Sequence, residues 1–157
     1  MSAYSSQQFL TSPQETANLA ARIAPHLRAG DTVLLEGPIG AGKTHFARAV
    51  ILARISVPED IPSPTYTLVQ TYDAGDVEIW HCDLYRLTSP NEALELGLED
   101  AFENSICLVE WPDRLADLAP NDALLLSFSV AAEAEHRHLT ASAKSARWQP
   151  VLDLIHD

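Results

Sequence analysis

The sequence predicts an α/β domain: a three-layer, P-loop NTPase-like fold in which helices flank a central mixed sheet that has a parallel core and antiparallel hairpins. Three observations lead to this prediction. Short apolar runs alternate along the chain with segments of helical spacing. The apolar run that ends at Glu36 is followed by a glycine-rich stretch and then by a helical pattern. Two pairs of candidate strands are each joined by a short polar turn, which is typical of antiparallel hairpins.

Length and composition set the limits of this prediction. The 157 residues are enough for one domain over 1–157 that buries roughly two thirds of its unfolded surface. Hydrophobic residues make up 46% of the chain and charged residues 20%, as in an ordinary globular protein. The chain has no apolar run long enough to cross a bilayer, and its first fifteen residues lack the pattern of a signal peptide, so we expect a cytoplasmic protein with no membrane partner.

The charge and the cysteines exclude two classes of function. A net charge of −12 argues against autonomous binding of nucleic acid, because such binding requires Lys and Arg to replace the phosphate counterions, and we expect no DNA partner. A phosphate ligand of so acidic a chain needs a local cradle of backbone dipoles. Cys82 and Cys107 lie in separate apolar runs without zinc-ligand spacing, which indicates reduced thiols in the core.

The first elements are indicated by caps, breakers and spacing. Ser12–Glu15 has the pattern of a capping box with proline at the first helical position, so a helix begins there. Pro25 is expected to kink or shorten this helix, and Gly30 to end it. The run Thr32–Glu36 suits a buried strand, and a helix is expected from Thr44.

The rest of the chain supplies the hairpins and the remaining helices. Strands are expected over 66–72 and 77–83, and the turn Asp73–Asp76 between them favours an antiparallel pair. A short helix over Asn91–Leu98 and a buried strand over 105–111 follow. A second hairpin is expected from 122–130 and 136–143, and a last short helix over 146–155 despite Pro150.

The glycine-rich stretch after the first buried strand matches the P-loop pattern, in which four residues separate Gly37 from Gly42-Lys43-Thr44. Glycines allow backbone N–H groups to turn toward phosphate oxygens, and the N-terminus of the next helix adds its dipole. Lys43 is then expected to reach the β and γ phosphates and the Thr44 hydroxyl to bind magnesium. The alternative, a glycine-rich turn that only caps a helix, does not require Lys followed by a hydroxyl at this spacing. The predicted phosphate-binding residues are Gly37, Pro38, Ile39, Gly40, Ala41, Gly42, Lys43 and Thr44.

A P-loop also requires a carboxylate across the metal, near the end of a neighbouring strand. Asp83 and Glu110 both end apolar runs, where α/β folds place their ligand sites, although either residue could also be a helix cap or a surface carboxylate. The segment Ser63–Leu68 carries three hydroxyls, on Ser63, Thr65 and Thr67, that suit a switch segment sensing a γ-phosphate. Ser-Pro-Thr is also common turn chemistry, so the residues alone leave both interpretations open.

Four motifs in the order GPIGAGKT, SPTYTLV, HCDLYRL and VEWPDRL resemble the TsaE (YjeE) family, the small bacterial P-loop ATPases of tRNA threonylcarbamoyladenosine biosynthesis. The resemblance covers roughly Thr11 to Leu115, with Arg137 as a further family-type strand arginine. It departs from the family at Pro38-Ile39, where many relatives have Asp-Leu or Asn-Leu. Only backbone donors are needed there, so the departure does not weaken the nucleotide-binding prediction.

The resemblance implies a role for each matching residue. Gly37 to Thr44 would bind the phosphates of ATP, and Mg²⁺ would be held by Thr44, by Asp83 in the Walker B role, and by Glu110, which would bind the metal or orient the attacking water. Thr65 would sense the γ-phosphate. Trp111 matches the tryptophan beside the family's glutamate and would lie at the nucleotide, although a simple core aromatic fits it equally well. Tyr85-Arg86 would serve shape or partner contact.

The function implied by the resemblance is ATP hydrolysis that drives a complex of two partner proteins, TsaD and TsaB. The tRNA would be held by that complex, which agrees with the acidic charge, and the isolated chain would be a poor ATPase stimulated by its partners. The alternative is a small P-loop kinase or phosphotransferase, which usually needs an arginine-rich lid that the sequence does not display. A GTP-binding switch would carry an Asn-Lys-x-Asp segment, and the sequence has none.

Overall fold

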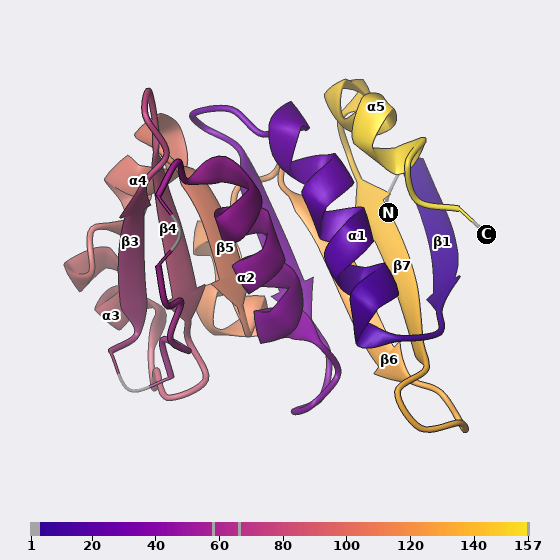
Figure 1. Cartoon of the computed structure of the whole chain (residues 1–157). Helices are drawn as coiled ribbons and strands as arrows, with labels where there is room; N and C mark the ends of the chain where they lie inside the picture. The colour runs from indigo at the N-terminus through magenta and orange to yellow at the C-terminus, as the bar shows by residue number, and fades with distance from the viewer. Residues whose placement is uncertain (1–3, 58, 66, 157) are drawn as a thin grey trace.

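The structure is a computed structural model that describes residues 4–57, 59–65 and 67–156. Within this part of the chain, a single seven-stranded mixed sheet has the order β1-β7-β6-β2-β5-β4-β3 (Figure 1). The strands are β1 Tyr4–Leu10, β2 Thr32–Glu36, β3 Val69–Asp73, β4 Glu78–Asp83, β5 Ile106–Glu110, β6 Leu124–Val130 and β7 Arg137–Ala143. The α/β class and the mixed sheet are as the sequence predicted.

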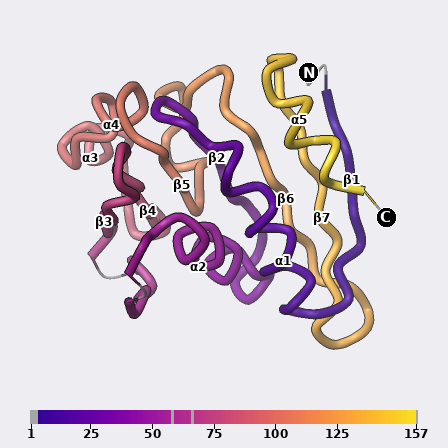
Figure 2. The backbone as a smooth tube through the Cα atoms, turned by 45° about the horizontal axis from the view of Figure 1, so that its top comes forward, coloured from indigo at the N-terminus to yellow at the C-terminus, as the bar shows by residue number. Residues whose placement is uncertain are grey.

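Helices lie on both faces of the sheet, which gives the predicted three layers. The α-helices are α1 Pro13–Ile23, α2 Lys43–Arg54, α3 Pro90–Glu95, α4 Leu98–Asn104 and α5 Gln149–Leu152. Three 3₁₀ segments join them: η1 Ala24–His26, η2 Pro112–Leu118 and η3 Ala146–Trp148. Both views place α1, α2 and α5 on one face and α3 and α4 on the other (Figures 1 and 2). A separate apolar cluster fills the core on each side.

The second face of the sheet is covered only in part. The apolar cluster under α3, α4 and η2 reaches β4, β5 and β2. Farther along the same face, Gln7 of β1, Thr140 of β7 and Ser129 of β6 are exposed. On this face the helices therefore cover the part of the sheet around β4, β5 and β2 and leave β1 and β7 uncovered.

The parallel part of the sheet brings three strand ends together. β2 pairs in parallel with both β5 and β6, and β5 pairs in parallel with β4. The hairpins β3–β4 and β6–β7 and the pair β1–β7 are antiparallel. In this register Asp83 lies opposite Glu110, and Glu110 lies opposite Leu35, one residue before the end of β2. Both predicted carboxylates thus occupy the sheet edge from which the glycine-rich loop departs.

The predicted start of the first helix and its shortening at Pro25 are confirmed, but the predicted end at Gly30 is wrong. Ser12 Oγ accepts a hydrogen bond from Glu15 N at 3.1 Å, and Glu15 Oε1 accepts one from Thr11 N at 2.6 Å. The helix ends at Ile23 and continues as one 3₁₀ turn around Pro25, before Gly30 is reached. Pro25 has no N–H to continue the α-helical hydrogen bonds, so the helix ends at this proline and does not extend to Gly30.

Three other expectations need correction. Asn91–Leu98 is not one helix, because Gly97 has φ of 87° and separates α3 from α4, and α4 was not predicted. The strand expected over 66–72 begins at Val69, and Tyr66 lies outside the described residues. The final helix consists of two short pieces, η3 and α5. β1 was not predicted at all.

The cysteines agree with the expectation of reduced thiols in the core. Cys82 and Cys107 are buried and unpaired. Burial raises the pKa of Cys107 to about 12 and that of Cys82 well above its usual value, so neither thiol ionises readily. Among the described residues, no helix is long and apolar enough to cross a membrane.

Candidate functional site

The loop between β2 and α2 requires its glycines for two different reasons. Gly40 and Gly42 have φ of 83° and 107°, and a Cβ there would meet no atom within 4 Å, so the left-handed backbone itself selects glycine. Gly37 has φ of 142°, and a Cβ at that position would also clash with the backbone oxygen of Phe128 on β6. Gly42 is the N-cap of α2, so the positive end of the helix dipole faces the loop.

Lys43 is held at the mouth of this loop. Lys43 is only 4% exposed, and its Nζ donates a hydrogen bond to Gly37 O at 2.6 Å. The same Nζ lies 3.6 Å from the centroid of the Trp111 ring, a cation–π contact. Burial lowers the pKa of Lys43, and the nearby carboxylates of Glu110 and Asp83 act in the opposite direction. The ammonium group is therefore placed where a phosphate would meet it.

Glu110 joins the loop to the sheet. Thr44 Oγ1, in the first turn of α2, lies 2.7 Å from Glu110 Oε1 and 2.9 Å from Oε2, and it donates to this carboxylate. The remaining polar contact is with His81, whose Nε2 lies 2.8 Å from Glu110 Oε2. Glu110 is 2% exposed and His81 is fully buried. The predicted metal hydroxyl and one predicted metal carboxylate are thus already in contact.

Asp83 joins the switch segment to the same site. Thr65 Oγ1 donates to Asp83 Oδ2 at 3.0 Å and shares a hydrogen bond of 2.8 Å with Ser63 Oγ. The other carboxylate oxygen, Oδ1, accepts from Tyr85 N at 3.1 Å. Thr67 does not take part: its hydroxyl accepts from Gln70 Nε2 at 2.9 Å instead. Of the three candidate hydroxyls, that of Thr65 therefore reaches the site directly, and that of Ser63 contacts it only through Thr65.

These side chains line one cavity of about 250 Å³. Its walls come from the loop, from α2 and from the ends of β4 and β5. The lining residues are Ile39, Lys43, Thr44, Thr65, Asp83, Tyr85, Glu110 and Trp111. All four residues predicted as catalytic, all three predicted as metal ligands, and Trp111 lie in this cavity.

The comparison with protein families tests the family resemblance that the four motifs indicated. The family model described as "Threonylcarbamoyl adenosine biosynthesis protein TsaE" matches residues 10–139. The chain belongs to the TsaE family.

Individual members of the TsaE family resemble this chain over most of its length. A protein from Rickettsia bellii named "tRNA threonylcarbamoyladenosine biosynthesis protein TsaE" is 43% identical over 130 residues, which cover 83% of this chain and 90% of that protein. A Bacillus subtilis protein of the same name is 32% identical over 148 residues, 92% and 91% of the two chains. The crystal structure of Bacillus subtilis YdiB superimposes with a TM-score of 0.80 at 26% identity and covers 96% of this chain and 93% of that one.

Sequence reasoning missed His81 in this TsaE-family site and gave no role to Arg137. His81 stands two positions before Asp83 on β4, so strand alternation places both on the face toward α2, and that spacing was the available signal. Arg137 was noted without a role. Its Nη2 donates to Gly40 O at 3.0 Å, and it lines a second cavity of about 250 Å³ on the other side of the loop, together with Pro13, Thr16, Gly40, Gly42, His45 and Glu135.

The oxygen donors of the site fit Mg²⁺. The Thr44 hydroxyl and the carboxylates of Asp83 and Glu110 are hard ligands of the kind that Mg²⁺ prefers. Within the described ranges, no group of three or more His, Cys, Asp or Glu side chains is arranged to hold a metal ion by itself. The two observations agree, because Mg²⁺ at a P-loop draws most of its ligands from phosphates and water.

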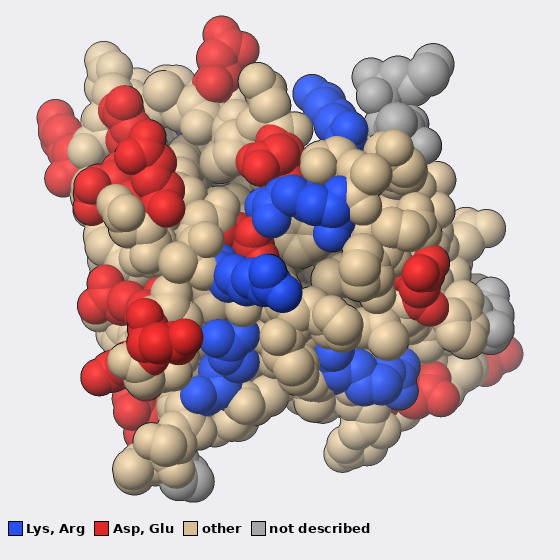
Figure 3. Space-filling model, turned by 90° about the horizontal axis from the view of Figure 1, so that it is seen from above, with Lys and Arg blue, Asp and Glu red and all other residues tan. Residues whose placement is uncertain are grey.

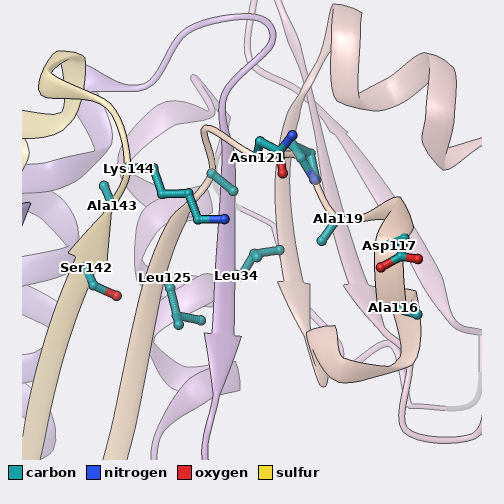
Figure 4. Close-up of a pocket in the computed structure, with 11 residues that line it drawn as sticks. Leu34, Ala116, Asp117, Ala119, Asn121, Leu125, Ser142, Ala143 and Lys144 are labelled. Atoms are coloured by element: carbon teal, nitrogen blue, oxygen red, sulfur yellow. The ribbon is translucent and has the colours of Figure 1, made fainter. Parts of the chain in front are cut away.

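A larger cavity lies away from the P-loop. It measures about 480 Å³ and is bordered by η2, β2, β6 and β7. Lys144 and Leu125 border it on one side and Asp117 on the other, and Leu34 and Asn121 lie between them (Figure 4). It contains none of the predicted site residues, so size alone does not locate the site of this TsaE-family chain.

Proposed function

We propose that this chain binds ATP and Mg²⁺, hydrolyses ATP to ADP and phosphate, and by this reaction supports threonylcarbamoyladenosine modification of tRNA. One observation carries the proposal: Lys43, Thr44, Asp83 and Glu110 line a single cavity at the mouth of the glycine-rich loop. The name shared by the family and its relatives supports the pathway. The cytoplasm remains the predicted location.

The loop and Lys43 would bind the phosphates. The backbone N–H groups from Gly37 to Thr44 and the N-terminus of α2 supply donors to anionic oxygens. Lys43 needs only to exchange its hydrogen bond to Gly37 O for one to a phosphate oxygen. Because the ammonium is shielded from water, its attraction to phosphate is stronger than that of an exposed lysine.

Thr44, Asp83 and Glu110 would hold Mg²⁺. The metal, when bound, would neutralise charge that develops on the phosphate oxygens. A carboxylate near the γ-phosphate would also orient the attacking water, and both Asp83 and Glu110 lie in the cavity where that water would sit. Thr65 contacts Asp83 directly, so a change at the γ-phosphate would be felt by the segment that carries Ser63 and Thr65.

The nucleoside would lie on the other side of the loop, in the second cavity. That cavity borders Gly40 and Gly42, so it adjoins the phosphate cradle on the side opposite Lys43. His45, from the first turn of α2, is anchored by a contact of 2.8 Å to Pro13 O at the start of α1. Arg137 supports the loop itself through Gly40 O.

The partners would be TsaD and TsaB, and the chain alone would be a weak ATPase. Large side chains at the rim of the phosphate cavity support docking of a protein there: Ile39 is 76% exposed and Tyr85 is 45% exposed. Exposed apolar groups beside an open site are typical of surfaces that a partner covers. A partner that closes this rim would exclude water and complete the site.

The decisive experiment is an ATPase assay of the chain with and without TsaB and TsaD. We expect turnover to rise several-fold when both partners are added, and we expect Lys43→Ala to abolish phosphate-dependent nucleotide binding. Unchanged nucleotide affinity in Lys43→Ala would overturn the P-loop assignment. Turnover that is indifferent to the partners would favour the alternative, a small phosphotransferase.

A further inference from the structure

His81 is a buried titratable residue for which the proposed mechanism has no use. It lies in the middle of β4, is 0% exposed, and faces α2 together with Ile79 and Asp83, since alternate residues of a strand share a face. Ile79 packs in the apolar core on that side. An imidazole in such surroundings is costly unless its nitrogens are paired.

Only one of the two ring nitrogens of His81 is paired. Nε2 lies 2.8 Å from Glu110 Oε2, while Nδ1 is buried and has no hydrogen-bond partner among the described residues. An ionised carboxylate can only accept, so the proton of this hydrogen bond is on Nε2. Leucine would fill the same space without burying an unpaired nitrogen, so packing alone gives no reason for histidine here.

The contact between His81 and Glu110 affects the orientation of the carboxylate at the centre of the site. Glu110 is itself almost fully buried, and its partners are Thr44 on one side and His81 on the other. Thr44 reaches both oxygens, so it does not by itself fix how the carboxylate is turned. His81 contacts Oε2 alone and therefore sets the rotation of the group about its last bond.

We propose that His81 is a positioning residue: its Nε2–H holds Glu110 Oε2 so that Oε1 faces Thr44 and the metal side of the cavity. The inference rests on the proposed role of Glu110 at Mg²⁺. It follows the general pattern in which the groups that bind a metal are oriented by a hydrogen bond from behind, and loss of that bond weakens metal affinity.

Two variants separate positioning from packing. His81→Leu keeps an apolar side chain of similar bulk and removes the donor. His81→Gln keeps an N–H donor at the end of a side chain of similar reach. The measurement is the affinity for a fluorescent ADP analogue as a function of Mg²⁺ concentration, at one fixed pH, with the affinity in EDTA as the control for the P-loop alone.

We expect His81→Leu to raise the Mg²⁺ concentration at half-maximal effect roughly 10- to 100-fold, with the affinity in EDTA unchanged. His81→Gln should recover most of the loss. In a Glu110→Ala background, His81→Leu should have no further effect, because its action passes through Glu110. Equal losses in the Leu and Gln variants, an unchanged Mg²⁺ dependence in His81→Leu, or an effect that persists without Glu110 would each overturn the proposal.

A measurement without nucleotide or metal keeps the proposal separate from the proposed function. Nitrogen-15 NMR of the imidazole side chains should show His81 protonated on Nε2, with a resonance that moves in Glu110→Ala. A His81 resonance that is indifferent to Glu110 would overturn the positioning role. Wild-type ADP affinity that is indifferent to Mg²⁺ would overturn instead the metal part of the proposed function.

Discussion

Thr65 connects the segment before β3 to the carboxylate at the end of β4. Its hydroxyl donates to Asp83 Oδ2 and shares a hydrogen bond with Ser63. Thr65 thus links a loop to the end of a strand, and loops are generally the more mobile of the two. A residue in this position can respond to the γ-phosphate without contributing to the binding of ADP, which has none.

We predict that Thr65→Ala leaves ADP affinity unchanged and lowers ATP hydrolysis by roughly 10²-fold, the usual effect of removing one aligned hydrogen-bond donor from a phosphate or oxyanion site. Thr65→Ser retains the hydroxyl and should retain most of the activity. Single-turnover hydrolysis and ADP titration measure the two quantities. Equal losses of binding and hydrolysis would make Thr65 a scaffold residue.

The residues of the site differ in how well the sequence predicted them. Lys43 and Thr44 are set by a local pattern, because the phosphate cradle needs them at fixed spacing from Gly37. Asp83 and Glu110 needed only the rule that strand ends carry ligands. His81 was missed because its role depends on the register of β4 with β5, which brings two strands distant in the chain side by side. Thr67 was named together with Ser63 and Thr65, but in the structure its hydroxyl contacts Gln70.

At the scale of elements, local sequence signals predicted where helices begin better than they predicted which strands pair. The capping box and the glycine-rich loop act within a few residues, and both were recognised. β1 has little of the β-branched composition of a strand, and it exists through pairing with β7 near the other end of the chain. The break between α3 and α4 at Gly97 was missed because a glycine inside a helical pattern does not by itself show that its backbone adopts the left-handed conformation.

The C-terminal segment η3–α5 closes the core under β1. Trp148 is 2% exposed, and its Nε1 donates to Asp122 O at 2.5 Å. Beside it, Arg147 forms an ion pair of 2.6 Å with Asp31, a buried carboxylate just before β2. The segment thus ties the last residues of the chain to the strand that leads into the P-loop.

We predict that Trp148→Ala lowers the free energy of unfolding by about 3–5 kcal/mol, because a large buried ring and its hydrogen bond are removed together. The exposed neighbour Gln149→Ala should cost less than about 1 kcal/mol. Urea unfolding at constant pH measures both variants. A loss in Trp148→Ala no larger than that in Gln149→Ala would show that the segment does not stabilise the fold.

At the scale of the whole molecule, the distribution of charge bears on whether this chain could bind tRNA by itself. Figure 3 looks onto the end opposite the P-loop, where α1 and α2 finish, and shows Lys and Arg in the middle of that face with Asp and Glu crowded to one side. Arg22 and Arg54 lie in the last turns of these helices, where cations offset the negative end of the dipole. Arg54 donates to Ala24 O and Leu27 O.

Arg147 is a second basic group that is engaged at this end. Arg147 pairs with Asp31 at 2.6 Å and with Asp122 at 3.3 Å. Arg54 and Arg147 therefore stabilise the fold at this end of the molecule, and the net charge of the whole chain remains −12. A protein binds RNA nonspecifically by releasing the counterions of phosphates, and these two guanidinium groups are not available for that exchange.

We predict that the isolated chain does not retain tRNA in a filter-binding assay at physiological salt, whereas a mixture with TsaB and TsaD does. The physical reason is that repulsion from an acidic surface is not overcome by a few basic groups that are mostly engaged in capping and ion pairs. Retention by the chain alone that weakens steeply as salt is raised would contradict this prediction. It would mean that this subunit contributes phosphate contacts of its own, and Arg28→Ala would then be the variant with which to locate them.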